Sequence, residues 1–332
     1  MTDHADTMGR IWQRLMEADR IGICSHAYPD GDAIGSQLAL AELLWAQGKE
    51  VILMNRHNVP ENLRFLKGSE AVRVVGAVPP GLDVLVFIEC TEPRRADLTG
   101  WEQCPLWVNI DHHACNTRYA HLNWVAPGAP CVGTMLYELQ QRLGLPASPA
   151  FYEDVYVALI SDTANFQYNL RPDTFRWAYE LVQRGVPAEE LVRRVFGQYP
   201  ERRWRLLRMA LDTLQLRMDG RIALMTVTQS MLQAVDARYE DTDGFVDYAL
   251  KTRGVQVAAL LKEIEPATFR VSLRANGQID LLPLAKRFGG GGHSRAAALV
   301  LRGSLGEVQA RVLAALEGLL RDEGRMTKAS SG

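Results

Sequence analysis

Side chains that can bind a metal ion or move a proton are gathered in four short segments of this chain. The first has the spacing His26-x-x-x-Asp30-x-Asp32, and the others carry Glu89, the run Asp111-His112-His113, and Asp162. Each segment alone has an ordinary structural explanation, because Pro-Asp-Gly is typical of a turn, an Asp can cap a helix, and a strand can end in a solvated acid. Whether the segments meet in the fold decides between these explanations and a shared chemical site.

The elements that precede these segments predict that they do meet. Short apolar runs are typical of buried strands, and they occur at 21–26, 51–54, 84–88 and 105–108. Apolar residues at helical spacing predict helices at 8–19, 33–47, 131–143 and 151–160. This alternation favours an α/β fold with a doubly wound, mostly parallel sheet. Because such sheets bind ligands beyond the carboxyl ends of their strands, we expect the four segments to converge on one edge.

The pattern changes in the second half of the chain. Residues 173–217 are helical and polar, with several arginines, which we interpret as a solvated connecting helix pair; guidance of an anion by some of these arginines is the alternative. A second, smaller α/β domain is then indicated by strand-like segments at 221–227, 255–264 and 268–274. An amphipathic helix at about 305–320 closes this domain, and we expect the residues after Arg321 to be frayed.

Composition excludes several classes of protein. A chain of 332 residues with 47% hydrophobic and 23% charged residues is globular and long enough for two domains. A formal net charge of −2 provides no overall basic field for gripping long nucleic acid, although a local site can still hold a short anion. Five scattered cysteines without a C-x-x-C pair favour a reducing compartment. With no secretion signal and no apolar run of membrane-spanning length, we expect a cytoplasmic protein.

The convergent carboxylates and imidazoles predict a two-metal site. Carboxylates packed this closely repel one another, so that either their pKa values rise or divalent cations neutralise them. Mixed imidazole and carboxylate ligands without a thiolate favour Mn²⁺, with Co²⁺ or Fe²⁺ as alternatives. A pair of such ions can generate hydroxide and stabilise the entering and leaving oxygens of a phosphoryl displacement. The sequence therefore predicts metal-dependent hydrolysis of a phosphoester.

The same motifs resemble those of the DHH phosphoesterase superfamily. The matching segments are His-Ala-Tyr-Pro-Asp-Gly-Asp-Ala-Ile-Gly-Ser at 26–36, Asp-His-His-x-x-Asn at 111–116, Ser161-Asp162, and Gly-Gly-Gly-Gly-His at 289–293. The resemblance covers about residues 20–320 and is closest to the nanoRNase and 3′-phosphoadenosine-5′-phosphate phosphatase branch. It implies a DHH catalytic domain at 1–190, a helical linker at 191–220, a DHH-associated substrate-binding domain at 221–322 and a tail at 323–332.

The resemblance also implies a role for each metal-binding candidate. One ion would be held by His26 and Asp30, and the other by Asp32, His112 and Asp162. The family usually has an Asp that bridges the two ions, whereas the matching residue here is Glu89. A bridging carboxylate is thus retained, with a longer side chain.

Further roles concern the substrate. Asp111 would orient a His ligand, His113 would contact the scissile phosphate and donate a proton to the leaving oxygen, and Asn116 would help to hold the phosphate. In the second domain, the glycine run would bring backbone N–H groups close to a phosphate or base. The residues of this segment would be Gly289, Gly290, Gly291, Gly292 and His293. The guanidinium group of Arg274 would bind a terminal phosphate.

These inferences predict a Mn²⁺-dependent phosphodiesterase that hydrolyses very short RNA oligonucleotides to mononucleotides. Removal of the 3′-phosphate from 3′-phosphoadenosine-5′-phosphate is a related activity for the same site. Two alternatives stay open: cleavage of cyclic di-AMP or its linear product in signalling, and nucleotide binding without catalysis. We expect no long duplex nucleic acid and no membrane among the partners. The sequence leaves open which substrate is preferred, which end is attacked, and whether the protein forms a homodimer.

Overall fold

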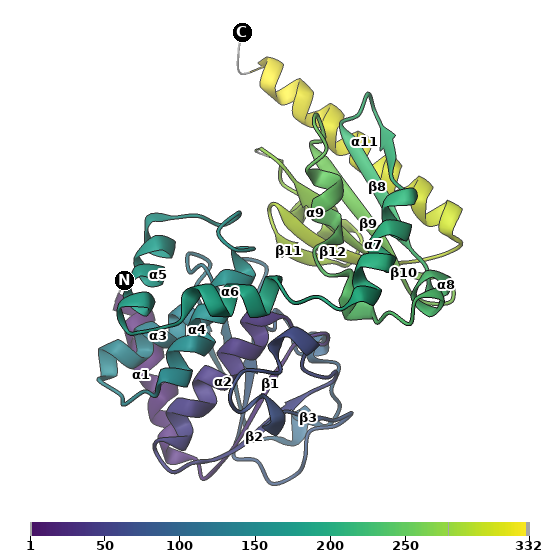
Figure 1. The fold of residues 1–332 in the computed structure, drawn as a ribbon. Helices are drawn as coiled ribbons and strands as arrows, with labels where there is room; N and C mark the ends of the chain where they lie inside the picture. Colours follow the sequence, from purple (N-terminus) through teal and green to yellow (C-terminus); the bar gives the residue numbers. More distant parts are fainter. Residues whose placement is uncertain (1, 278, 330–332) are drawn as a thin grey trace. The chain divides into compact units, whose positions relative to one another are not determined.

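A computed structural model describes residues 2–277 and 279–329, and Figure 1 labels their helices and strands. The chain divides into two compact units between Gln198 and Tyr199. The separate linker expected at 191–220 is absent from the described residues. Helix α6 (Ala188–Phe196) buries Leu191 and Val195 in the core of the first unit. Helix α7 (Glu201–Asp212) buries its apolar face in a core of the second unit, so each half of the expected linker belongs to one unit.

The first unit is built on a parallel six-stranded sheet with the order β3-β2-β1-β4-β5-β6. The strands are β1 (Arg20–Ser25), β2 (Glu50–Asn55), β3 (Arg73–Val74), β4 (Val84–Ile88), β5 (Leu106–Asp111) and β6 (Leu122–Val125). Strand β1 pairs with β2 on one side and with β4 on the other, so the chain reverses direction across the sheet at that point. Ligands of open α/β sheets bind at such a reversal. The predicted α/β class is confirmed.

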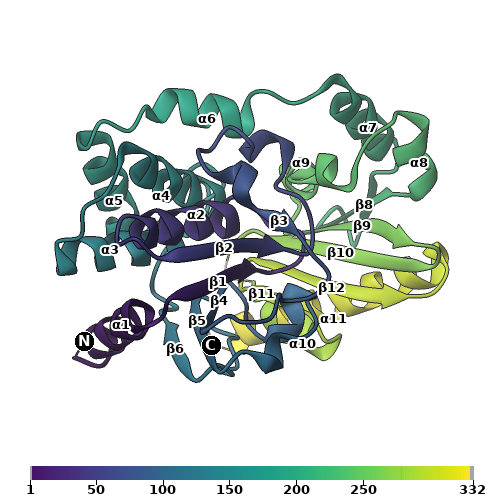
Figure 2. The ribbon, with the colours of Figure 1, turned by 90° about the horizontal axis from the view of Figure 1, so that it is seen from below.

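Helices cover one face of this sheet. The first unit contains, besides α6, the helices α1 (Thr2–Glu17), α2 (Gly31–Trp45), α3 (Val132–Leu143), α4 (Pro149–Asp162) and α5 (Pro172–Gln183). Helices α2, α3 and α4 lie on the same side of β1 and β2 (Figure 2). Helices α2 and α4 approach closely because position 35 is a glycine, where an added Cβ would lie 2.4 Å from the carbonyl oxygen of Asp154. This approach brings together the two helices that carry Asp32 and Asp162.

The other face of the sheet is covered by short segments. It packs against a small apolar cluster that includes Phe87, Leu98 and Trp101. The covering segments are 3₁₀ turns, η3 (Pro93–Ala96) and η4 (Trp101–Gln103), rather than α-helices. Phe87 meets the ring of Trp101 edge to face, with centroids 6.2 Å apart. Aliphatic and aromatic side chains together thus bury this face of the sheet.

The second unit has a mixed six-stranded sheet with the order β11-β12-β10-β9-β8-β7. Its strands are β7 (Gln215–Arg217), β8 (Ile222–Val227), β9 (Val257–Glu265), β10 (Thr268–Ala275), β11 (Gly291–His293) and β12 (Ala296–Arg302). Only β8 and β9 are parallel among the described pairs. Its helices are α7, α8 (Gln229–Ala234), α9 (Phe245–Leu250), α10 (Leu282–Arg287) and α11 (Leu305–Ala329). Two separate apolar cores line this sheet.

The tail expected at 323–332 is mostly helical. Helix α11 continues to Ala329. Residues 330–332 lie outside the described part of the chain.

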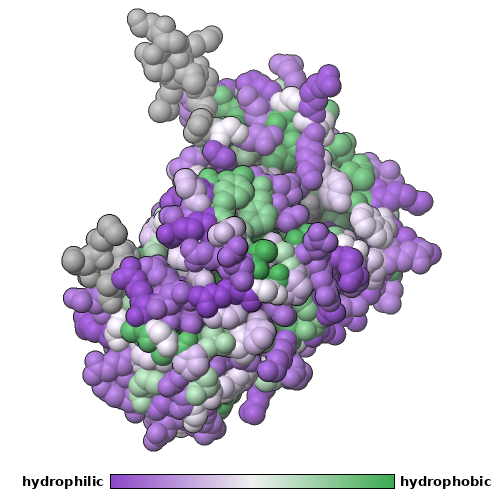
Figure 3. Space-filling model, turned by 60° about the vertical axis from the view of Figure 1, so that its left-hand side comes forward, coloured by the Kyte–Doolittle hydropathy of each residue, from purple (hydrophilic) through white to green (hydrophobic). Residues whose placement is uncertain are grey.

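The face drawn in Figure 3 is largely hydrophilic, with small hydrophobic areas between the polar side chains. Within the described residues, no helix has both the length and the apolar character that crossing a membrane requires.

Candidate active site

The expected metal-binding residues lie where the fold places ligands. They stand at the carboxyl ends of β1, β4 and β5 and at the adjoining ends of α2 and α4, in the order His26, Asp30, Asp32, Glu89, His112 and Asp162. Asp30 is the N-cap of α2 and accepts a hydrogen bond from the Ala33 N–H at 3.0 Å. Asp32 lies in the first turn of α2 and is buried, so it does not cap this helix. It is therefore available for another role.

One group of potential ligands contains His26, Asp30 and Glu89, whose donor atoms all lie within 4.8 Å of one another. His26 Nε2 is 3.5 Å from Glu89 Oε2 and 3.9 Å from Asp30 Oδ2. The other ring nitrogen, Nδ1, lies 2.9 Å from the carbonyl oxygen of Ala27. Donation of the Nδ1 proton to that carbonyl leaves the lone pair of a neutral ring on Nε2, pointing at the two carboxylates.

A second group contains Asp32, Glu89 and His112. His112 Nε2 lies 3.7 Å from Asp32 Oδ2 and 3.9 Å from Glu89 Oε1. Asp162 Oδ2 is also close to this nitrogen, at 3.8 Å. The carbonyl oxygen of Ala129 is 3.1 Å from His112 Nδ1, and it fixes the ring as Ala27 fixes that of His26.

The spacing of these atoms fits two divalent cations. The distances from the imidazole nitrogens to the carboxylate oxygens, 3.5 to 3.9 Å, exceed those of good hydrogen bonds. Ligand atoms that each bind one ion at about 2.0–2.2 Å are separated by about 3 to 4 Å, as they are here. Glu89 directs Oε2 toward the first group and Oε1 toward the second. The longer carboxylate can thus reach both groups.

The backbone of Glu89 is in an uncommon conformation that serves this arrangement. Its φ of +57° is in the left-handed region, which disfavours non-glycine residues by roughly 1–2 kcal/mol. Its N–H donates to the carbonyl oxygen of Ile110 at 3.0 Å and keeps the residue aligned with β5. Strained residues of this kind tend to occur at functional sites.

The charges in the two groups are unbalanced without cations. Burial opposes ionisation of Glu89, yet the nearby imidazoles of His112 and His26 hold the pKa of this carboxyl well below its ordinary value. Burial and the neighbouring Glu89 raise the pKa of Asp32 well above its ordinary value. Buried carboxylates in contact with too few positive groups are what a divalent cation would neutralise.

Asp32 is held by donors from two helices. Its carboxylate accepts from Ser36 Oγ at 2.7 Å and from the N–H groups of Val132 and Gly133 at 2.9 and 3.2 Å. The two N–H groups belong to the first turn of α3, where unpaired donors favour an anion. The sequence motif contained Ser36, but only the fold shows that it anchors Asp32.

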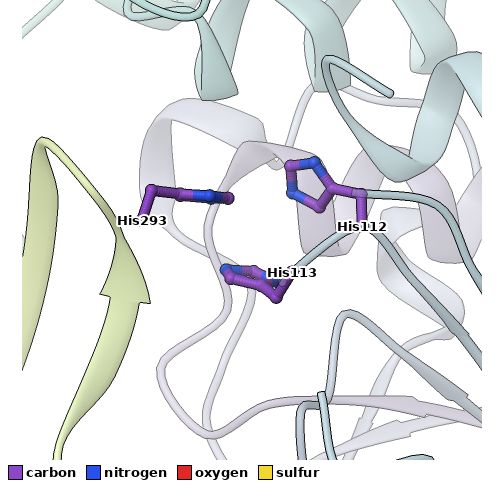
Figure 4. A group of neighbouring side chains, drawn as sticks. All are labelled: His112, His113 and His293. Atoms are coloured by element: carbon purple, nitrogen blue, oxygen red, sulfur yellow. The ribbon is translucent and has the colours of Figure 1, made fainter. Parts of the chain in front are cut away.

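Asp111 is completely buried and orients His113. Its Oδ1 accepts from His113 Nδ1 at 2.8 Å and from the N–H groups of His112 and His113 at 2.7 and 3.1 Å. Burial alone would raise the pKa of Asp111, but the hydrogen bonds from His113 and Asn116 hold it below its ordinary value. The rings of His112 and His113 lie edge to face, with centroids 4.9 Å apart (Figure 4). Asp111 was expected to orient a His ligand, but its side chain binds the ring of the proton-donor candidate instead.

Asn116 was expected to help hold the substrate phosphate, but its side chain is hydrogen-bonded within the protein. Its amide nitrogen donates to Asp111 Oδ2 at 2.5 Å, to Asn109 Oδ1 at 2.7 Å and to the Cys90 carbonyl at 3.2 Å, and its oxygen accepts from the Arg118 N–H at 2.7 Å. Both amide hydrogens are therefore committed within the protein. A contact with the substrate phosphate would require these bonds to break, so the geometry favours a positioning role.

The glycine run of the second unit is part of its sheet. Gly291 and Gly292 pair with β12, and Gly292 has a φ of +130°. An added Cβ at Gly290 or Gly292 would lie 2.2 or 2.4 Å from a backbone oxygen of β12. Close packing of two strands thus explains these glycines. The same strand carries His293, the third residue labelled in Figure 4.

Arg274 lies on the half-buried face of β10, and its Nε is 3.6 Å from Asp247 Oδ1. Arg270 shares this face and pairs in register with Lys262 of β9. Burial lowers the pKa of Lys262 to about 8. Of these three basic residues the sequence predicted only Arg274, and the register of β9 and β10 adds Arg270 and Lys262.

Comparisons with known proteins agree with this fold. Residues 20–161 match the DHH family, N-terminal domain, and residues 226–322 match the DHHA1 domain. The bifunctional oligoribonuclease and PAP phosphatase NrnA of Thermus thermophilus is 34% identical over 92% of this chain and 91% of its own length. The protein of the same name from Bacillus subtilis is 26% identical over 92% of this chain and 96% of its own length.

A solved structure resembles the whole chain. An exopolyphosphatase-related protein from Bacteroides fragilis has a TM-score of 0.83 at 25% identity, with 98% of each chain covered. The identity to the Thermus thermophilus relative and its coverage, together with the two domain matches, confirm the predicted family. The chain belongs to the DHH family of phosphoesterases.

Proposed function

We propose that this protein is a Mn²⁺-dependent phosphodiesterase that hydrolyses very short RNA oligonucleotides to mononucleotides. The observation that carries the proposal is the position of Glu89, whose two oxygens face two separate groups of potential ligands. The imidazole and carboxylate donors without a thiolate favour Mn²⁺, with Co²⁺ or Fe²⁺ as substitutes. When bound, a pair of such cations supplies a hydroxide at neutral pH and stabilises the entering and leaving oxygens of the phosphate.

The side chains around the cation ligands perform the remaining steps. Asp111 holds His113 through Nδ1, so that Nε2 of the same ring is the nitrogen that donates a proton to the leaving oxygen. Asn116 keeps Asp111 in place through its Oδ2. Hydrogen bonds from Ser36 and the first turn of α3 fix Asp32 before substrate binds. Such preorganisation lowers the reorganisation required during the reaction.

The proposed substrate class has three supports. The Thermus thermophilus and Bacillus subtilis relatives are named for oligoribonuclease and PAP phosphatase activities. The formal net charge of −2 does not favour binding to long nucleic acid. The basic face with Arg270, Arg274 and Lys262 offers cations for a second phosphate of a short substrate. We further propose that the same site removes the 3′-phosphate of 3′-phosphoadenosine-5′-phosphate.

A substrate panel tests this proposal. Purified protein with Mn²⁺ is given oligoribonucleotides of two to ten residues, cyclic di-AMP and 3′-phosphoadenosine-5′-phosphate, and kcat/KM is measured for each. We expect the highest values for the shortest oligonucleotides and a steady fall with length. Glu89→Gln should abolish turnover, whereas Glu92→Gln, which changes an exposed acid a few residues away, should leave it unchanged. Fastest cleavage of cyclic di-AMP, or equal cleavage of all lengths, would contradict the assignment.

A further inference from the structure

The loop that carries His26 and Asp30 also carries an exposed aromatic ring. Tyr28 lies between these two residues and is 39% exposed. Its ring stacks on the imidazole of His57, with centroids 3.8 Å apart and planes inclined by 17°. His57 follows β2, the neighbour of β1 in the sheet. The stacked pair therefore joins two loops at the carboxyl edge of the sheet, beside the cation ligands.

Several contacts hold the Tyr28 ring in one orientation. The Tyr28 N–H donates to His57 Nδ1 at 3.3 Å, and the preceding Ala27 N–H donates to the Arg95 carbonyl at 2.6 Å. Burial and the Arg56 cation lower the pKa of His57, which favours the neutral ring that can accept at Nδ1. Tyr28 also has a φ of +56°, a conformation that is uncommon for a residue with a side chain. The strained backbone and the contacts together indicate that the Tyr28 ring has a functional role.

We propose that Tyr28, backed by His57, is a stacking platform for a nucleobase of the nucleotide next to the scissile phosphate. This inference rests on the proposed function and specifies how the same site recognises its substrate. Consecutive Cα atoms are about 3.8 Å apart, so the Cα of Tyr28 lies within about 8 Å of those of both His26 and Asp30. A base on the platform is thus within one nucleotide of the phosphate that the cation ligands would hold.

A nucleobase suits this surface better than other parts of the substrate. Tyr28 presents an uncharged aromatic face, which binds flat π-systems and lacks the positive charge that favours an inorganic phosphate chain. Stacking is also tolerant of sequence, because every base has a π-face. The platform would therefore bind any of the four nucleobases, as an enzyme that hydrolyses short RNA of mixed sequence must.

Paired substrates test the platform in the whole, Mn²⁺-loaded enzyme. The substrates are diadenylate and the same dinucleotide backbone with stable abasic residues. Tyr28→Leu should raise KM for diadenylate by about 5- to 150-fold, the effect of losing one base–aromatic stack, while leaving the abasic substrate and kcat nearly unchanged. Tyr28→Trp should retain wild-type values. Phe175→Leu is the matched control, because Phe175 is likewise exposed, at 53%, and stacks on another aromatic ring, that of Phe166.

A binding measurement without turnover provides a second readout. A dinucleotide containing 2-aminopurine, a fluorescent base quenched by stacking, is titrated with protein in EDTA. Wild type and Phe175→Leu should quench the fluorescence, and Tyr28→Leu should not. Equal quenching by wild type and Tyr28→Leu, or equal losses on the base-bearing and abasic substrates, would overturn the platform. If wild type failed to hydrolyse diadenylate, the proposed function would fall, whereas equal hydrolysis of diadenylate and its abasic analogue would overturn only the platform.

Discussion

Replacing Asp111 by Asn tests whether this buried carboxylate acts through His113. The carboxylate accepts three hydrogen bonds at Oδ1 and one at Oδ2, the last from the amide of Asn116. An Asn can keep an oxygen at the first position, but it then turns its NH₂ group toward the NH₂ group of Asn116. Alternatively, it turns its NH₂ group toward the three donors. Either orientation removes the negative charge that contacts the His113 ring.

The size of the loss follows from these contacts. A charge-assisted hydrogen bond is about twice as strong as a neutral one, and a buried donor left without an acceptor costs about 1–3 kcal/mol. Proton transfer by a positioned side chain contributes roughly 10²- to 10⁴-fold in rate. We therefore expect Asp111→Asn to lower kcat for a dinucleotide by about 10²- to 10³-fold, or about 3–4 kcal/mol of activation free energy. Metal content should remain at the wild-type level, since Asp111 contacts His112 through the backbone N–H, while the carbonyl of Ala129 fixes the His112 ring.

The assay compares two leaving groups. A ribonucleotide leaves as an alkoxide that requires a proton, whereas p-nitrophenolate leaves readily without one. If Asp111 acts through His113, hydrolysis of a p-nitrophenyl phosphodiester should lose far less than hydrolysis of the dinucleotide. Equal losses on both substrates, or loss of bound metal, would refute this reasoning and assign Asp111 to the fold or to the metal site.

Three further variants probe other parts of the structure. Burial and nearby Glu42 raise the pKa of Asp154 well above its ordinary value. Because the folded state then binds a proton that the unfolded state has lost, the free energy of unfolding of the wild type should fall as pH rises. In urea unfolding between pH 5 and 8, Asp154→Asn should remove up to about 1.4 kcal/mol of this dependence per pH unit. If the difference in free energy of unfolding between wild type and Asp154→Asn stayed constant with pH, this prediction would be wrong. Glu89→Asp should retain more activity and more bound Mn²⁺ than Glu89→Gln, since charge matters more than reach; the reverse order would exclude Glu89 as a shared ligand. Arg274→Ala should raise KM for dinucleotides and spare a chromogenic phosphodiester, and equal effects on both would place Arg274 in the chemistry or the fold.

Residues that follow strands could be placed from the sequence because parallel strands end at one edge of their sheet. His26, Glu89 and His112 each follow a run that reads as a buried strand, so their convergence was predictable. Asp162 was harder to place, since it ends a helix rather than a strand. Its approach to His112 depends on Gly35, which lets α2 and α4 pack closely.

Other features had no sequence signal of sufficient strength. Two adjacent histidines cannot be told apart in a sequence. The geometry shows that Asp111 binds the ring of His113, whereas the carbonyl of Ala129 binds the ring of His112. Strands as short as β3, with two residues, cannot be distinguished from loop by periodicity. The glycine run could serve a ligand or a close strand contact, and the backbone of β12 shows the second reason.

The central claim is that Glu89 is shared by two divalent cations. Anomalous diffraction from crystals grown with Mn²⁺, measured on both sides of the manganese absorption edge, tests it most directly. We expect two manganese peaks, both in contact with Glu89. One should be bounded by His26 and Asp30, and the other by Asp32, His112 and Asp162. A single peak, or two peaks of which only one contacts Glu89, would contradict it.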